Sequence, residues 1–75
     1  MRTLRPETIK NLQKSYPRGC RVELLQMDDP QAPPVGTSGT VIGVDDLGTI
    51  HVNWDNGSGL GVAYGEDECR RIDND

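Results

Sequence analysis

The sequence predicts a small, mainly β domain preceded by one short amphipathic helix. From Cys20 onward, apolar and polar residues alternate, which is typical of half-buried strands. The segments Asp-Asp-Leu-Gly (45–48) and Asp-Asn-Gly-Ser (55–58) are turn signatures between such strands. The chain has 75 residues, enough for one small domain whose core is only just sufficient.

Residues 6–14 have the features of a short helix. Pro6 suits the first helical turn, where its missing N–H costs nothing, and Glu7 lies near the positive end of the helix dipole. A narrow apolar stripe at helical spacing is formed by Ile9, Leu12 and Tyr16. We expect this stripe to dock on the rest of the domain, and a detached helix presented to a partner is the alternative.

Five short strands follow the helix. They are predicted at residues 20–27, 40–44, 49–54, 60–64 and 69–72. Between the first two, residues 28–36 contain three prolines, which cannot donate to a strand ladder, so a long stiff loop is expected there. A long loop between the first two strands, followed by tight hairpins, is the order of connections in an SH3-like barrel. Closure of such a barrel removes the exposed edge strands. An open α+β sheet is the competing architecture.

The chain therefore divides into a basic helix or leader, residues 1–15, and a barrel, residues 16–75. The predicted core consists of Val22, Leu24, Val41, Val44, Ile50, Val52, Trp54, Leu60, Val62 and Ile72. In this topology the first and last strands pair antiparallel, which places Cys20 and Cys69 at opposite ends of the pair. Their Cα atoms should lie beyond the ~7 Å limit for a disulfide, so two free thiols are predicted.

Charge is distributed very unevenly along the chain. The net charge is −4, but residues 1–21 carry +5, whereas residues 22–69 contain no Lys or Arg and carry −9. The simplest explanation of this pattern is solubility, together with attraction between the basic segment and the acidic body within the chain. A sharper interpretation is that one pole meets a partner of opposite charge. The acidic body is unsuited to lying along a phosphate backbone, where Lys and Arg provide the affinity.

Several function classes are not expected. No apolar run approaches the ~20 residues of a membrane helix, and the N-terminus lacks the apolar stretch of a secretory signal, so a cytoplasmic protein is expected. No Cys or second His lies at zinc-ligand spacing from His51, and the acidic pairs offer too few oxygens for calcium, so no metal or other cofactor is expected. Catalysis is not expected either, because so small a barrel provides no concave site to gather Cys20, His51 and the acids.

A shallow recognition surface is expected beside the long loop. Trp54 belongs to the core by its parity, but it ends a strand, where one indole edge can remain exposed. Together with Tyr64, Pro33 and Pro34 it would form the floor of a groove for a peptide. The candidate partner-binding residues are Asp28, Asp29, Pro33, Pro34, His51, Trp54 and Tyr64. His51 is otherwise read as an exposed strand residue.

Two functions are compatible with these features. The first is a non-enzymatic protein-interaction module whose acidic barrel binds a partner with a basic segment; in a phage or mobile element this extends to inhibition of a host protein that binds nucleic acid. The alternative is a nucleic-acid-binding accessory protein that acts through its N-terminal segment. The candidate phosphate contacts are then Arg2, Arg5, Lys10, Lys14 and Arg18.

Several specific sequence runs are spread along the chain, at residues 16–24, 27–30, 39–41, 43–46 and 50–58. These runs resemble a bacterial and phage family catalogued as a domain of unknown function, number 4314. The sequence departs from that family at Cys20, where Thr is expected, and around residues 64–69. More loosely, the Gly-Thr-Val … Val-x-Trp-Asp-Asn-Gly pattern is similar to the Mind-bomb/Herc domain, an SH3-like barrel, which implies peptide binding by analogy.

Overall fold

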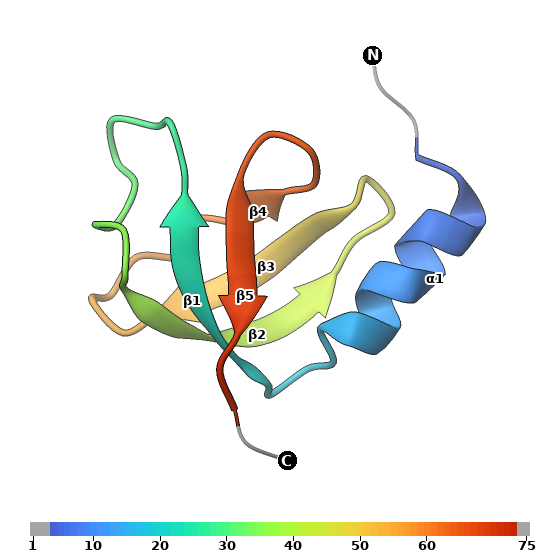
Figure 1. Ribbon diagram of the computed structural model, residues 1–75, viewed down its shortest axis with the longest axis horizontal. Coiled ribbons are helices and arrows are strands. Elements are labelled where there is room, and N and C mark those ends of the chain that lie inside the picture. Colours follow the sequence, from blue (N-terminus) through green and yellow to red (C-terminus); the bar gives the residue numbers. More distant parts are fainter. Residues whose placement is uncertain (1–3, 74–75) are drawn as a thin grey trace.

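The computed structural model describes residues 4–73, which form one helix and five strands (Figure 1). These are α1 (Pro6–Ser15), β1 (Arg21–Gln26), β2 (Ser38–Val44), β3 (Thr49–Trp54), β4 (Val62–Ala63) and β5 (Glu68–Arg71). The strands form a single antiparallel sheet in the order β4-β3-β2-β1-β5. The predicted mainly β class with a short N-terminal helix is therefore confirmed.

The sheet is not closed, so the expected closure of the barrel is wrong. β4 and β5 are the two edges of the strand order, and in the described chain only an isolated bridge between Tyr64 and Asp67 links the segments around them. The chain passes from β4 to β5 through a tight turn in which the N–H groups of Glu66 and Asp67 both donate to the Ala63 carbonyl. The hydrogen-bonding groups of the turn are thus paired within the turn itself, and no ladder of backbone hydrogen bonds joins β4 to β5.

β4 is shorter than the predicted strand at residues 60–64. The indole N–H of Trp54 donates to the Leu60 carbonyl at 2.8 Å, and the Trp54 backbone N–H donates to Ser58. These bonds hold residues 55–61 as a loop. Within its turn, Gly57 adopts a φ of 94° but Asn56 does not enter the left-handed region, so only the glycine of this pair uses the conformation that the sequence predicted.

The turn between β2 and β3 forms as predicted. The Asp45 carboxylate accepts hydrogen bonds from the backbone N–H groups of Leu47 at 2.9 Å and Thr49 at 3.0 Å. Gly48 has a φ of 83°, which a residue with a Cβ rarely adopts. The Asp and the Gly together fix the direction in which the chain reverses.

The core follows the period-two pattern of the strands. Its buried members are Cys20, Val22, Leu24, Val41, Ile50, Val52, Trp54 and Val62. Three predicted members are only partly buried, namely Val44, Leu60 and Ile72. Val44 ends β2, Leu60 lies in the loop before β4, and Ile72 follows the end of β5, so each is at the margin of the sheet.

The apolar stripe of α1 docks on the sheet. Leu12 is buried, and the amide of Gln13 donates to the Val44 carbonyl at 3.4 Å. At the other end of the helix, the guanidinium of Arg71 donates to the Ser15 carbonyl at 3.3 Å. Figure 1 shows α1 beside the end of β2 and the turn that follows it. Within residues 4–73, no helix has the length and apolar character needed to cross a membrane.

Candidate functional site: a cleft between α1 and β5

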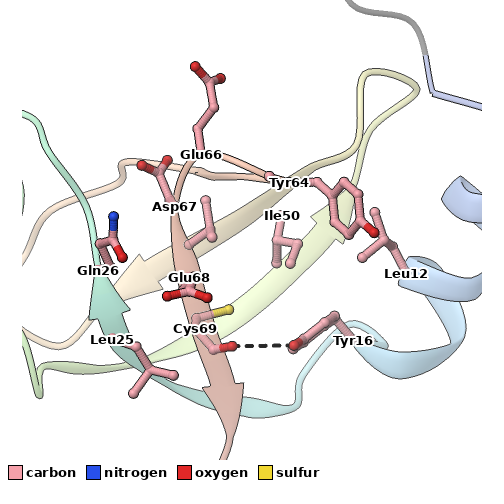
Figure 2. Close-up of a pocket in the computed structure, with 12 residues that line it drawn as sticks. Leu12, Tyr16, Leu25, Gln26, Ile50, Tyr64, Glu66, Asp67, Glu68 and Cys69 are labelled. Carbon is pink, nitrogen blue, oxygen red and sulfur yellow. Dashed lines mark hydrogen bonds between the residues drawn. The ribbon is translucent and has the colours of Figure 1, made fainter.

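A cleft of about 550 Å³ lies between α1, β5 and the turn that joins β4 to β5. Leu12 of α1 and Tyr16, the residue after the helix, form one side. Glu68 and Cys69 of β5 form the other, with Ile50 between them (Figure 2). A concave site is therefore present in so small a domain, although Cys20 and His51 do not line it. The physical reason is the open sheet, because no ladder closes the gap beside β5.

The rim of this cleft is acidic and lacks counter-charges. Glu66 and Glu68 are exposed, and neither makes an ion pair with another described residue. Asp67 is used differently, because its carboxylate accepts the Ala63 N–H at 3.0 Å and holds the turn. We refer to Glu66 and Glu68 as the acidic rim.

The arginines of the sheet are already paired with other carboxylates. Arg21 contacts Asp55 through both guanidinium nitrogens, one of them at 2.9 Å. The remaining two pairs are Arg70 with Glu23 at 2.7 Å and Arg71 with Asp73 at 3.0 Å. The pairing with Arg21 lowers the pKa of Asp55, and that with Arg71 lowers the pKa of Asp73. Each of these three arginines thus has a carboxylate partner outside the acidic rim.

A second cleft of about 440 Å³ adjoins the first and extends its negative surface. It is lined by Asp28 and Asp29 of the loop after β1, and it shares Gln26, Glu66 and Asp67 with the first cleft. The Asp29 carboxylate accepts the Gln31 N–H at 2.8 Å, which fixes the start of the loop. Two of the predicted partner-binding residues thus lie beside the acidic rim.

Two tyrosines contribute aromatic surface to the first cleft. Tyr64 is 48% exposed, and its ring lies next to Leu12 in Figure 2. Tyr16 is half-buried, and its hydroxyl donates to the Cys69 carbonyl at 3.4 Å. Burial, followed by the nearby Cys69 thiol, raises the pKa of Tyr16. The phenol of Tyr16 is therefore neutral at ordinary pH.

The cysteine of the cleft is a poor nucleophile. Burial, with a further contribution from Cys20, raises the pKa of the Cys69 thiol to about 11, so the thiol is protonated near neutrality. Neither Cys20 nor Cys69 forms a disulfide, as predicted. Cys69 is opposite Leu24 in the β1–β5 register, four residues along from Cys20, which accounts for the absence of a bridge between them.

The expected groove of Trp54, Tyr64 and the prolines does not form one cleft. Trp54 is 3% exposed and ends β3, whereas the Tyr64 N–H donates to Gly48, just before β3 begins. About 17 Å of strand separates these two ends. Pro33 is buried and Pro34 is exposed, and neither they nor Trp54 line the cleft that contains Tyr64.

His51 is an exposed strand residue, as predicted, but it has a partner. Its Nε2 lies 2.8 Å from the Asp45 carboxylate across the β2–β3 turn. Partial burial acts to raise the pKa of Asp45, but hydrogen bonds from His51 and from the backbone of Thr49 and Leu47 outweigh this effect and lower it. Among residues 4–73, no group of three His, Cys, Asp or Glu side chains is arranged to hold a metal ion.

The basic candidates are exposed on and around α1. Arg5, Lys10, Lys14 and Arg18 are all exposed, and Arg2 lies outside the described residues. The sequence reasoning missed the cleft residues Glu66, Glu68 and Cys69, and it assigned Leu12 and Tyr16 only to helix docking. The run of three acidic residues two positions after Tyr64 was the available signal for the rim.

Comparison with known families gives one match. The family model described as "Domain of unknown function (DUF4314)" matches residues 5–72. No curated protein matches the chain, and no solved structure does either. The match spans α1, all five strands and both clefts. The chain is a member of the DUF4314 family.

Proposed function

We propose that this chain is a non-enzymatic protein-interaction module whose cleft binds a basic segment of a partner protein. The observation that carries the proposal is the unpaired acidic rim of Glu66 and Glu68 beside an apolar floor. Complementary charge across an interface provides specificity and accelerates encounter, more than it adds raw affinity. The neighbouring Asp28 and Asp29 extend the attractive field beyond the cleft.

The apolar part of the cleft suits the stem of a long basic side chain. Lys and Arg bury their methylene groups on apolar surface while the charged head remains near water or a carboxylate. Leu12, Ile50 and Val62 line the same cleft as the acidic rim and offer such an apolar surface. A basic residue of a partner segment placed here would contact the apolar lining with its stem and the acidic rim with its charged head.

Two further observations support a binding role in a reducing compartment. The Cys69 thiol is held protonated, and His51, the only histidine, pairs with Asp45 on the β2–β3 turn rather than lining the cleft, so no imidazole is available there to activate the thiol. Two free thiols are usual in the cytoplasm, where we place the protein. In a phage or bacterial setting, the acidic cleft would cover the basic surface of a nucleic-acid-binding protein.

A photocrosslinking experiment tests this proposal. p-Benzoyl-phenylalanine replaces Tyr64 in the full chain, and in a control it replaces Ile42, which is 43% exposed on β2 and does not line the cleft. Crosslinking is carried out in cells, with nuclease added after lysis to one half, and the crosslinked peptide is sequenced by mass spectrometry. The Glu66→Lys/Glu68→Lys variant is tested in parallel, with its thermal unfolding measured as the control for folding.

The expected result is a protein crosslinked at position 64 through a Lys- or Arg-containing segment, insensitive to nuclease and lost in the charge-reversed variant. No product at position 64 would count against the cleft as a binding site. A product that survives charge reversal would count against recognition of a basic segment.

Nucleic-acid binding through α1 is the second candidate, and one observation favours it. Lys10 and Lys14 are four residues apart on the helix and both exposed, with no ion pair to another described residue. Lys10→Glu/Lys14→Glu should then abolish binding to a mixed-sequence DNA or RNA oligomer, with a steep salt dependence before mutation. Unchanged binding to the oligomer in this variant would exclude α1 as the contact.

A further inference from the structure

We infer that the cleft selects an arginine side chain, rather than a lysine, as the anchor of the bound segment. This inference rests on the proposed function and makes it specific. Three features of the cleft favour a planar guanidinium over an ammonium: a backbone carbonyl at the free edge of β5, the carboxylates of the acidic rim and two tyrosine rings.

The first feature is the carbonyl of Cys69, which faces away from the sheet. The Ile72 N–H donates to Arg21 on β1, whereas the N–H of Leu24, opposite Cys69, donates to Thr37 on the other side of β1. Because hydrogen-bonded pairs alternate along an antiparallel ladder, the peptide groups of Cys69 point to the free edge of β5. Its carbonyl accepts the Tyr16 hydroxyl at 3.4 Å, a long hydrogen bond that leaves acceptor capacity on the oxygen.

The second feature is the position of the acidic rim beside this carbonyl. Glu68 directly precedes Cys69, and Figure 2 shows both on the β5 side of the cleft. A guanidinium carries five N–H donors in a rigid fork, so one group can donate to a carboxylate and a carbonyl together. An ammonium is a compact, strongly hydrated point charge and gains little from this fixed arrangement of acceptors.

The third feature is the aromatic surface facing these acceptors. Tyr64 and Tyr16 lie across the cleft from Glu68, beside Leu12 (Figure 2). Arginine stacks on aromatic faces more often than lysine does, because its planar head is weakly hydrated. The methylene stem of the same residue would rest on Ile50 and Leu12.

Titration of the ¹⁵N-labelled full chain with small probes tests the inference. The probes are N-acetyl-argininamide, N-acetyl-lysinamide and N-acetyl-citrullinamide, the last having nearly the shape of arginine without its charge. The amide resonances of Tyr64, Glu66, Glu68 and Cys69 report binding. Glu68→Gln is the test variant, and Asp46→Asn, an exposed acid that does not line the cleft, is its matched control.

The arginine probe should shift the cleft resonances and bind at least about threefold more tightly than lysine, with no saturable effect from citrulline. Glu68→Gln should weaken arginine binding about three- to tenfold, since a charge-assisted hydrogen bond is lost at a partly exposed site. Asp46→Asn should leave the affinity unchanged.

Equal affinity for arginine and lysine at the same resonances would overturn the selectivity, while crosslinking of a basic segment at position 64 would still stand. Shifts confined to residues outside the cleft would overturn the arginine site itself. Arginine-specific shifts without any protein crosslinked at position 64 would support the site and count against the proposed protein partner. The two proposals can therefore fail separately.

Discussion

The hydroxyl of Tyr16 donates a hydrogen bond to the carbonyl of Cys69 across 53 positions of sequence, joining the residue after α1 to the free edge of β5. Tyr16→Phe removes this bond and keeps the ring, so the free energy of unfolding should fall by less than about 1 kcal/mol, because the bond is long. Tyr16→Ala also removes the packing and should cost about 2 kcal/mol. Urea unfolding followed by Trp54 fluorescence measures both, and equal losses would show that the ring contributes nothing.

The raised pKa of Cys69 predicts a loss of stability at alkaline pH. The unfolded thiol ionises around pH 9.0 and the folded one at about 11, so the contribution is fully present below pH 9 and is lost as the pH rises toward 11. After allowance for the partial exposure of the thiol, the loss should be on the order of 1 kcal/mol.

Cys69→Ala should flatten this part of the profile, measured by thermal unfolding from pH 7 to 11. Tyr16 has a raised pKa as well, so a smaller decline above pH 10 should persist in the variant. An unchanged profile between pH 9 and 10 would contradict the assignment to Cys69.

Asp45 should stabilise the β2–β3 turn much more than its neighbour Asp46. Asp45→Ala removes the acceptor for Leu47, Thr49 and His51 and should cost about 1 kcal/mol. Its pKa is lowered in the folded state, so its contribution is present above about pH 4 and is lost as the pH falls through the folded pKa. Asp46→Ala, at an exposed position with no side-chain hydrogen bond to a described residue, is the control for chemical denaturation at pH 7 and pH 3. If the two variants were equally stable at pH 7, the turn would not depend on these bonds.

Leu12 should be the main apolar contact that holds α1 on the sheet. Leu12→Ala should reduce the free energy of unfolding by about 2 kcal/mol, the low end for a leucine truncation, because the residue lies at the margin of the core. Leu47→Ala, at a position that is 69% exposed, should change it by less than about 0.5 kcal/mol. In Leu12→Ala, hydrogen exchange should also become faster at the amides of α1. If these amides stayed protected, contacts other than Leu12 would be holding the helix on the sheet.

Local chemistry made much of this fold predictable. β3 was predicted at its observed bounds because Ile50, Val52 and Trp54 alternate with polar residues, and Asp45 with Gly48 specified the turn before it. These features depend on neighbours within a few residues. The same parity correctly placed Trp54 in the core.

The gap and the cleft depend on contacts that have no local pattern. The start of β4 is set by Trp54, whose indole N–H donates to the Leu60 carbonyl. The turn after β4 is set by the Asp67 side chain, which accepts the Ala63 N–H. Residues from the two ends of the chain, such as Leu12 and Cys69, then meet in one cleft. Period-two alternation extends a strand wherever it continues, so it predicted a longer β4. The order of the strands, the long loop and the hairpins then predicted a closed sheet.

The position of α1 as one wall of the cleft has a consequence for dissecting the protein. Removing residues 1–15 would delete Leu12 along with the basic charges, so lost binding in a shortened chain would not distinguish a nucleic-acid contact from a dismantled peptide site. Conversely, a ligand that touches both α1 and β5 favours the state in which they are packed together. By mass action, saturation at 100 times Kd would add about 2.7 kcal/mol to the stability of that state. Binding of the ligand in the cleft and docking of α1 on the sheet would then be thermodynamically coupled.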